Sequence, residues 1–180
     1  MRTKNLVLRA LFAALIAVGT YIKIPTPLLP LTLQTLFVVL AGLLLGRKYG
    51  AVSVCVYVGA GLIGLPVFTG SAMNPTFGYI LGFIGGAWVA GYIAEKFRPC
   101  FMTWTLGSVA GIGVIYAVGI PYYYVMSKYY LGNELGVKTL LTYFVLMPIP
   151  GDLAKSVCAG LIVQRLAAFF PESFTWRREG

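Results

Sequence analysis

Long apolar segments, separated by short polar breaks that carry basic residues, dominate this sequence. Hydrophobic residues fill 59% of its 180 positions and charged residues only 11%, against roughly 25% in soluble domains. A soluble domain of this length cannot keep so much apolar surface from water, so we expect lipid to surround the chain. The sequence therefore predicts an all-α integral membrane protein, with one domain over residues 1–180.

The apolar segments predict six transmembrane helices, each close to the length that a bilayer requires. The second of them is short, and we expect it to begin a few residues earlier than its apolar run. The segment from Thr139 to Met147 is too short to cross, and we expect a short helix lying over the bundle. The predicted spans are Leu6 to Ile22, Leu33 to Gly46, Tyr49 to Leu65, Phe77 to Ala94, Phe101 to Met126 and Leu153 to Phe170.

The distribution of basic residues predicts the orientation of these spans. With both termini in the cytoplasm, ten basic residues face inward and three face outward, and Lys155 lies within the membrane. Such an excess agrees with the positive-inside rule. The inward set is Arg2, Lys4, Arg9, Arg47, Lys48, Lys96, Arg98, Arg165, Arg177 and Arg178, and the outward set is Lys23, Lys128 and Lys138.

Several classes of function are excluded by residues that the sequence lacks. It has no histidine, which argues against histidine-dependent hydrolases and HExxH zinc sites. It has no Walker A motif, so energy for uphill transport has to come from a partner or an ion gradient. The basic residues punctuate apolar runs, which does not indicate nucleic-acid binding. Cys55, Cys100 and Cys158 are expected to be free thiols. No cofactor and no metal site is predicted.

Small residues recur at helical spacing in two of the predicted spans. Such patterns let membrane helices approach closely, and packing within the bundle is the simpler interpretation of both. The alternative for the first span is a docking face for another membrane protein. The fourth span carries Gly78, Gly82, Gly86, Ala90 and Ala94, and the first span carries the AxxxA pairs Ala10 with Ala14 and Ala13 with Ala17.

Four polar residues interrupt the apolar background at the predicted outer ends of spans: Gln34, Asn74, Asp152 and Lys155. Asp152 after Pro150-Gly151 is also compatible with a helix N-cap, with Lys155 only its i, i+3 partner. An intramembrane charge, however, costs about 2.5–3.5 kcal/mol on insertion scales and usually serves a function. We therefore expect one outward-facing pocket that binds a small ligand with N–H groups and a carboxylate.

Three segments that contain these residues resemble the BioY family, and the resemblance covers nearly the whole chain. They are PTPLLPLTLQTLFVVLAGLLLG, GLIGLPVFTGSAMNPTFGYILGF and MPIPGDLAKSVCAGL. The family comprises biotin-binding S components of energy-coupling factor (ECF) transporters. The resemblance implies a six-helix protein of the cell membrane that captures biotin from outside. It also implies two kinds of partner, a transmembrane coupling protein and a pair of ATPase subunits, and no enzymatic activity of the chain itself.

The resemblance also implies roles for particular residues. Asn74, Asp152 and Lys155 match the positions expected to hold biotin, with Gln34 and Tyr79 in second rank. The docking face would be Ala10 with Ala14, or Ala13 with Ala17. Lys155 would either pair with the valerate of biotin or orient Asp152.

Two other classes of function remain compatible with the residues alone. A small integral-membrane enzyme would use Asp152 and Lys155 as its acid and base. A structural or assembly subunit would have the glycine ladder of the fourth span as its main feature.

Overall fold

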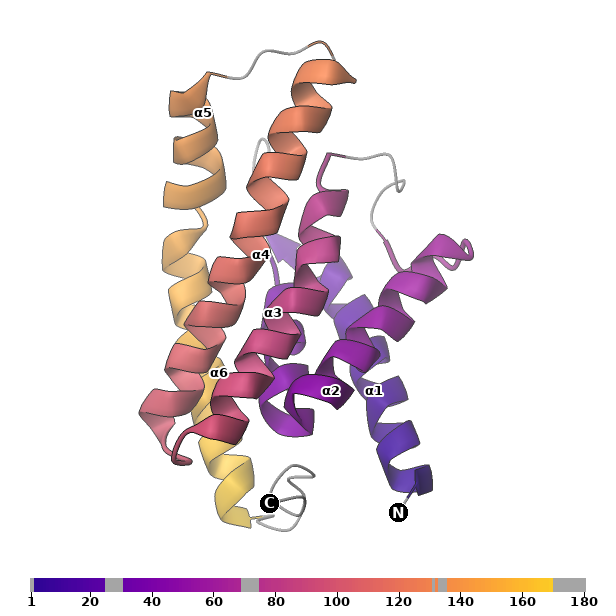
Figure 1. Ribbon diagram of the computed structural model, residues 1–180, viewed down its shortest axis with the longest axis vertical. Helices are drawn as coiled ribbons and strands as arrows, with labels where there is room; N and C mark the ends of the chain where they lie inside the picture. The colour runs from indigo at the N-terminus through magenta and orange to yellow at the C-terminus, as the bar shows by residue number, and fades with distance from the viewer. Residues whose placement is uncertain (1, 25–30, 69–74, 131, 133–135, 170–180) are drawn as a thin grey trace.

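A computed structural model describes residues 2–24, 31–68, 75–130, 132 and 136–169, which are mostly helical. The predicted all-α class is confirmed for this part of the chain, where a two-stranded sheet is the sole β-structure (Figure 1). The elements are α1 (Arg2–Tyr21), β1 (Lys23–Ile24), β2 (Leu31–Thr32), α2 (Gln34–Leu62), α3 (Phe77–Lys96), α4 (Phe101–Tyr129), α5 (Val137–Leu141), the π-helical turn η1 (Thr142–Leu146) and α6 (Ile149–Phe169).

The two short strands correct the prediction that the second span starts before its apolar run. β1 pairs antiparallel with β2, with Lys23 opposite Thr32 and Ile24 opposite Leu31. Helix α2 begins only after them, at Gln34. Pro25, Pro27 and Pro30 stand between the strands in the sequence, and proline disfavours helical backbone in itself and in the residue before it.

Helix α2 doubles back on itself at Gly46. This glycine has φ 81° and ψ 173°, a backbone conformation that is essentially restricted to glycine. Gln34 and Tyr57 are hydrogen-bonded at 2.7 Å, although in a straight helix they would lie about 35 Å apart. The two halves of α2 therefore run side by side, which agrees with the separation of two spans at Arg47 and Lys48.

Glu95, near the end of α3, stabilises this reversal. Its carboxylate accepts a hydrogen bond from the backbone N–H of Arg47 at 2.8 Å and pairs with the Arg47 Nε at 3.1 Å. A Cβ at Gly91 would lie 2.4 Å from the Arg47 backbone nitrogen. Only glycine leaves room for the reversal to pack against α3.

The glycines of α3 pack against α4, so the prediction of internal packing is confirmed for them. A Cβ at Gly86 would lie 2.9 Å from the Gly111 carbonyl oxygen, and one at Gly111 would lie 2.7 Å from the Gly86 carbonyl oxygen. Ala90 and Ala94 are fully buried on the same face of α3. Contact this close between backbones is what small residues provide in membrane helices.

The segment predicted to lie over the bundle does not do so. α5 and η1 precede α6 in nearly the same direction and extend beside the far half of α4 (Figure 1). The rings of Tyr123 and Phe144 pack there with centroids 4.2 Å apart. The apolar run extends over Lys138–Phe169, so the segment extends α6 instead of covering the bundle.

Within the described residues, four helical segments are long and apolar enough to cross a membrane, and Asn5–Tyr21 is a shorter apolar helix. They are Gln34–Leu62, Phe77–Lys96, Phe101–Tyr129 and Lys138–Phe169. α6 exposes Val157 and Leu161, four residues apart, on a face of the kind that contacts lipid. The free thiols predicted for Cys55, Cys100 and Cys158 are confirmed.

Candidate functional site

Asp152 occupies the first turn of α6 and is 5% exposed. The helix begins at Ile149, and the Asp152 N–H already donates to the Pro148 carbonyl. Asp152 therefore follows the N-cap position, and its side chain is available for tertiary contacts. Oδ2 accepts a hydrogen bond from the Tyr116 hydroxyl of α4, and Oδ1 pairs with the ammonium of Lys155.

The ammonium of Lys155 makes its contacts inside the protein. Besides Asp152, its Nζ donates to the Thr32 carbonyl at 3.0 Å and to the Thr35 hydroxyl at 2.7 Å. Of the three N–H donors of the ammonium, two therefore make hydrogen bonds to other parts of the chain, and the charge pairs with Asp152. The sequence-predicted pair thus joins α6 to β2, α2 and α4.

Tyr79 lies beside this cluster on α3. Its ring meets the ring of Tyr116 edge-on, with centroids 6.2 Å apart and an interplanar angle of 83°. Its side chain is 6% exposed, and its buried hydroxyl oxygen has no hydrogen-bond partner. Buried hydroxyls are nearly always paired, so this group is suited to a polar atom of a ligand.

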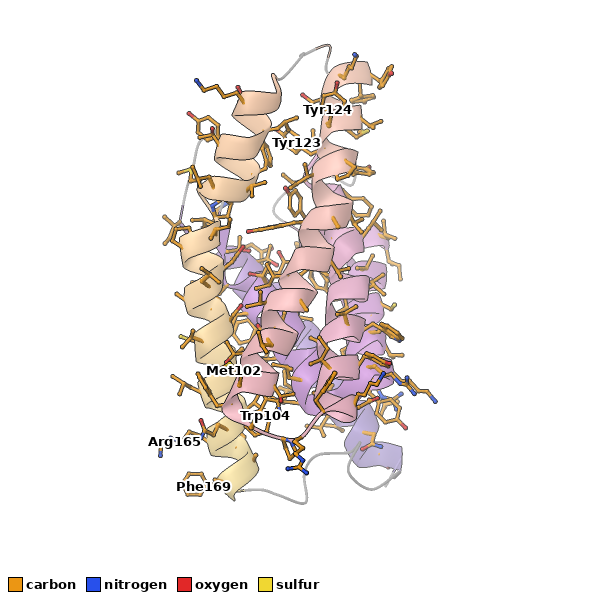
Figure 2. The ribbon with its side chains drawn as sticks, turned by 60° about the vertical axis from the view of Figure 1, so that its left-hand side comes forward. Met102, Trp104, Tyr123, Tyr124, Arg165 and Phe169 are labelled. Atoms are coloured by element: carbon orange, nitrogen blue, oxygen red, sulfur yellow. The ribbon has the colours of Figure 1, made fainter. Side chains whose placement is uncertain are left out.

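A groove of about 250 Å³ opens between α4 and α6 next to the carboxylate. Its accessible surface is almost entirely apolar, although Tyr116, Asp152 and Ser156 are among the residues that line it. Figure 2 shows α6 running beside α4, with Met102 and Trp104 near one end of the pair and Tyr123 and Tyr124 toward the other. The remaining lining residues are Val109, Ile112, Gly113, Ile149 and Leu153. An apolar groove with a few polar groups is the usual form of a small-molecule site.

Gln34 belongs to a second polar cluster, centred on Tyr57. The amide of Gln34 donates to the Tyr57 hydroxyl at 2.7 Å, and that hydroxyl donates to the Val67 carbonyl at 3.3 Å. Thr20 of α1 lies 3.3 Å from the same hydroxyl. Gln34 directly precedes Thr35, the partner of Lys155, in the sequence. Its own amide nitrogen, however, is directed to Tyr57.

Asn74 lies outside the described residues, so its predicted place in the pocket stays a prediction. Pro66 and Val67 belong to the segment that precedes Asn74 in the sequence. The Tyr57 hydroxyl donates to the Val67 carbonyl, and the Tyr21 hydroxyl donates to the Pro66 carbonyl.

The four alanines of α1 divide into two faces. Ala10 and Ala14 are exposed, together with large apolar neighbours such as Leu11, which is 50% exposed. Ala13 is 8% exposed in a core cluster, and Ala17 packs against the same cluster. Of the two AxxxA pairs, Ala10 with Ala14 is the one available to another protein.

Tyr116, Thr35 and Tyr57 are the contact residues that sequence reasoning missed. Each lies in a predicted apolar span, where an uncharged tyrosine or threonine is a weaker sign of a functional site than a charged residue. A usable signal was present for Tyr116, because a hydroxyl in the middle of a membrane span needs a partner. Among the described residues, no group of three or more Cys, Asp or Glu residues could hold a metal ion.

Comparison with known proteins gives concordant results. Residues 1–172 match the BioY family. A protein of Thermotoga maritima named "Biotin transporter BioY" is 41% identical over 169 residues, covering 91% of this chain and 95% of that protein. A protein of Lysinibacillus sphaericus named "Probable biotin transporter BioY" is 40% identical, covering 93% and 89%.

A solved structure resembles this fold closely. It is a crystal structure of the S-component for biotin from an ECF-type ABC transporter, with a TM-score of 0.82 and 28% sequence identity. The alignment covers 93% of this chain and 92% of that chain.

Proposed function

The chain belongs to the BioY family, and we propose that it is the biotin-capturing S component of an ECF-type transporter in the cell membrane. Its relatives are named as transporters, and the resemblance found in the sequence is confirmed. The enzyme and structural-subunit alternatives are therefore set aside. Residues 1–180 form one substrate-binding domain in this proposal.

The observation that carries the proposal is the buried Asp152 carboxylate beside an apolar groove. The Oδ1 atom of this carboxylate is paired with Lys155 but accepts no hydrogen bond. A carboxylate offers about four acceptor positions, of which Tyr116 and Lys155 use two. The positions that remain suit the two N–H donors of the ureido ring of biotin. The apolar walls of the groove suit its thioether ring and the methylene groups of its tail.

The other predicted ligand residues take different roles in this proposal. The unpaired hydroxyl of Tyr79 supplies a hydrogen bond to the ligand, and Asn74 stays a ligand residue on the strength of the sequence motif. Lys155 orients Asp152, because its ammonium pairs with that carboxylate and is held by hydrogen bonds to Thr32 and Thr35. Gln34 supports the site through Tyr57.

The membrane arrangement proposed here has six spans and cytoplasmic termini. The reversal of α2 at Gly46 supports counting two spans in that helix. Arg165 and Phe169 lie at the end of the molecule opposite Tyr123 and Tyr124 (Figure 2), and the start of α1 and the bend of α2 share the end where α6 finishes (Figure 1). Asp152 stands 13 residues before Arg165 on α6, about 20 Å along the helix. That depth lies inside a hydrocarbon core about 30 Å thick.

The proposed partners are a transmembrane coupling protein and two ATPase subunits, which would hydrolyse ATP for the complex. The exposed face of α1 that carries Ala10 and Ala14 supports docking to the coupling protein. Close approach of two helices needs small residues on the surface that they share. No cofactor is proposed for the chain itself, and biotin is its transported ligand.

A thermal-shift experiment on the purified protein in detergent tests the proposal. Biotin at 100 times its dissociation constant should stabilise the protein by about 2.7 kcal/mol, which raises the unfolding midpoint by roughly 5–10 °C for a chain of this size. Lipoic acid is the control ligand, because it has a comparable tail and a sulfur-containing ring but no ureido group. No shift with biotin, or an equal shift with lipoic acid, would contradict biotin recognition through Asp152.

A further inference from the structure

Tyr116 of α4 is the side chain that fixes Asp152 from outside α6. Its hydroxyl donates to Asp152 Oδ2, while Lys155 pairs with Oδ1. We propose that Tyr116 is a positioning residue for ligand recognition, whose hydroxyl sets the orientation of the Asp152 carboxylate. This inference rests on the proposed function and adds to it a residue that neither the motifs nor the charges in the sequence indicate.

The two contacts restrain different movements of the carboxylate. Lys155 follows Asp152 by one turn on the same helix, and Tyr116 is 36 positions earlier on another helix. With one oxygen held by each partner, the carboxylate plane cannot rotate freely about the Cβ–Cγ bond. A site prearranged in this way loses less conformational entropy when its ligand binds.

The ring of Tyr116 is well placed to carry this hydroxyl. It is half-buried, packs against both core clusters and lies edge-on to Tyr79. A hydroxyl has one proton to donate, and Tyr116 donates it to Asp152. The hydroxyl therefore has no proton left for the ligand, and the proposal assigns the effect of Tyr116 to the carboxylate that it orients.

Replacement of the hydroxyl alone separates this role from ring packing. Tyr116→Phe keeps the ring, and Tyr124→Phe is the matched control because it makes the same change at a 37% exposed residue of the same helix. We expect Tyr116→Phe to weaken biotin binding about tenfold or more, the usual effect of losing a hydrogen bond to a charged group. Tyr124→Phe should bind as the unchanged protein does.

Spectroscopy reads the orientation of the carboxylate directly, because Asp152 is the one aspartate in the 180-residue sequence. Protein made with ¹³C-carboxyl aspartate places the label at this single side chain. The antisymmetric carboxylate stretching band of the unliganded protein should shift in Tyr116→Phe and stay in place in Tyr124→Phe. A tyrosine that acts only by packing its ring would not produce that shift.

Two results would overturn the inference while leaving the proposed function intact. One is biotin binding by Tyr116→Phe with unchanged affinity. The other is weakened binding with an unshifted carboxylate band, which would make Tyr116 a direct ligand contact or a packing residue. Failure of the unchanged protein to bind biotin would instead contradict the proposed function.

Discussion

The ammonium of Lys155 donates a 2.7 Å hydrogen bond to the hydroxyl of Thr35, a residue 120 positions earlier in the chain. This contact joins the first half of α6 to the first turn of α2. The Thr32 carbonyl accepts a second hydrogen bond from the same ammonium. The Asp152–Lys155 pair is thus a part of the tertiary structure as well as a candidate ligand site.

Replacement of Thr35 by valine should therefore destabilise the protein. The change keeps the shape of the side chain but leaves one donor of a mostly buried ammonium unpaired, at a cost of about 1–3 kcal/mol. We expect the thermal midpoint in detergent to fall by several degrees. Thr32→Val is the matched control, since Thr32 contributes its backbone carbonyl. Equal midpoints for the two variants would show that the Thr35 contact contributes nothing.

Asp152→Asn should weaken biotin binding without preventing membrane insertion. An asparagine keeps the size of the side chain but replaces one acceptor oxygen with a donor, which opposes the N–H groups of the ureido ring. Hydrogen bonds to charged groups indicate a loss of at least tenfold in affinity. Titration with labelled biotin measures the effect. Glu95→Gln neutralises a carboxylate that pairs with Arg47 at the α2 reversal, and its biotin affinity should not change.

The alanines of α1 should separate docking from packing. Ala10→Leu and Ala14→Leu enlarge exposed positions, so we expect normal biotin binding but loss of co-purification with the coupling protein. Ala13→Leu enlarges a residue that is 8% exposed in the core, and overpacking of this kind costs about 1–3 kcal/mol. Its thermal midpoint should fall. Loss of biotin binding in Ala10→Leu would mean that this face belongs to the bundle itself.

The reversal of α2 should depend on Gly46. Alanine at φ 81° and ψ 173° is strained by about 1–3 kcal/mol, so Gly46→Ala should lower the thermal midpoint by several degrees. Gly59→Ala is the control in the same helix, because no atom lies within 4 Å of a Cβ there. Helix propensity favours that change by up to about 1 kcal/mol. A Gly46 variant as stable as the Gly59 variant would argue against a glycine requirement at the turn.

Cysteine labelling should establish the orientation. Cys100 precedes α4 at the end where α3 finishes, and hydrogen bonds with the side chain and then the backbone of Thr103 lower the pKa of its thiol. A lowered pKa increases the reactive thiolate near neutral pH, and that fraction declines as the pH falls below the pKa. With cytoplasmic termini, an impermeant reagent should reach Cys100 only after cell lysis.

The complementary variant places a cysteine at Tyr129, the exposed last residue of α4, on a background without the three native cysteines. It should react on intact cells. Labelling in the reverse pattern would place the groove entrance on the cytoplasmic side and would contradict capture from outside.

Much of the helical framework was predictable from apolar runs because lipid requires helices of a minimum length. α3 and α4 begin at the predicted residues Phe77 and Phe101. The predicted helix boundaries were wrong at two places, where the β1–β2 pair precedes α2 and where η1 precedes α6. Local hydropathy does not encode strand pairing, or whether a short apolar helix stacks on α6 or lies across the bundle.

At the candidate site, Asp152 and Lys155 could be identified as candidate ligand residues before the fold was known. A charge in an apolar background is costly and therefore informative without any structure. Their partners became visible only in the folded chain, because Tyr116, Thr32 and Thr35 lie 36 to 123 positions away in the sequence. The tertiary structure also shows which alanines of α1 face outward, since an AxxxA pattern recurs on both faces and only the packing of α1 against its neighbours distinguishes them.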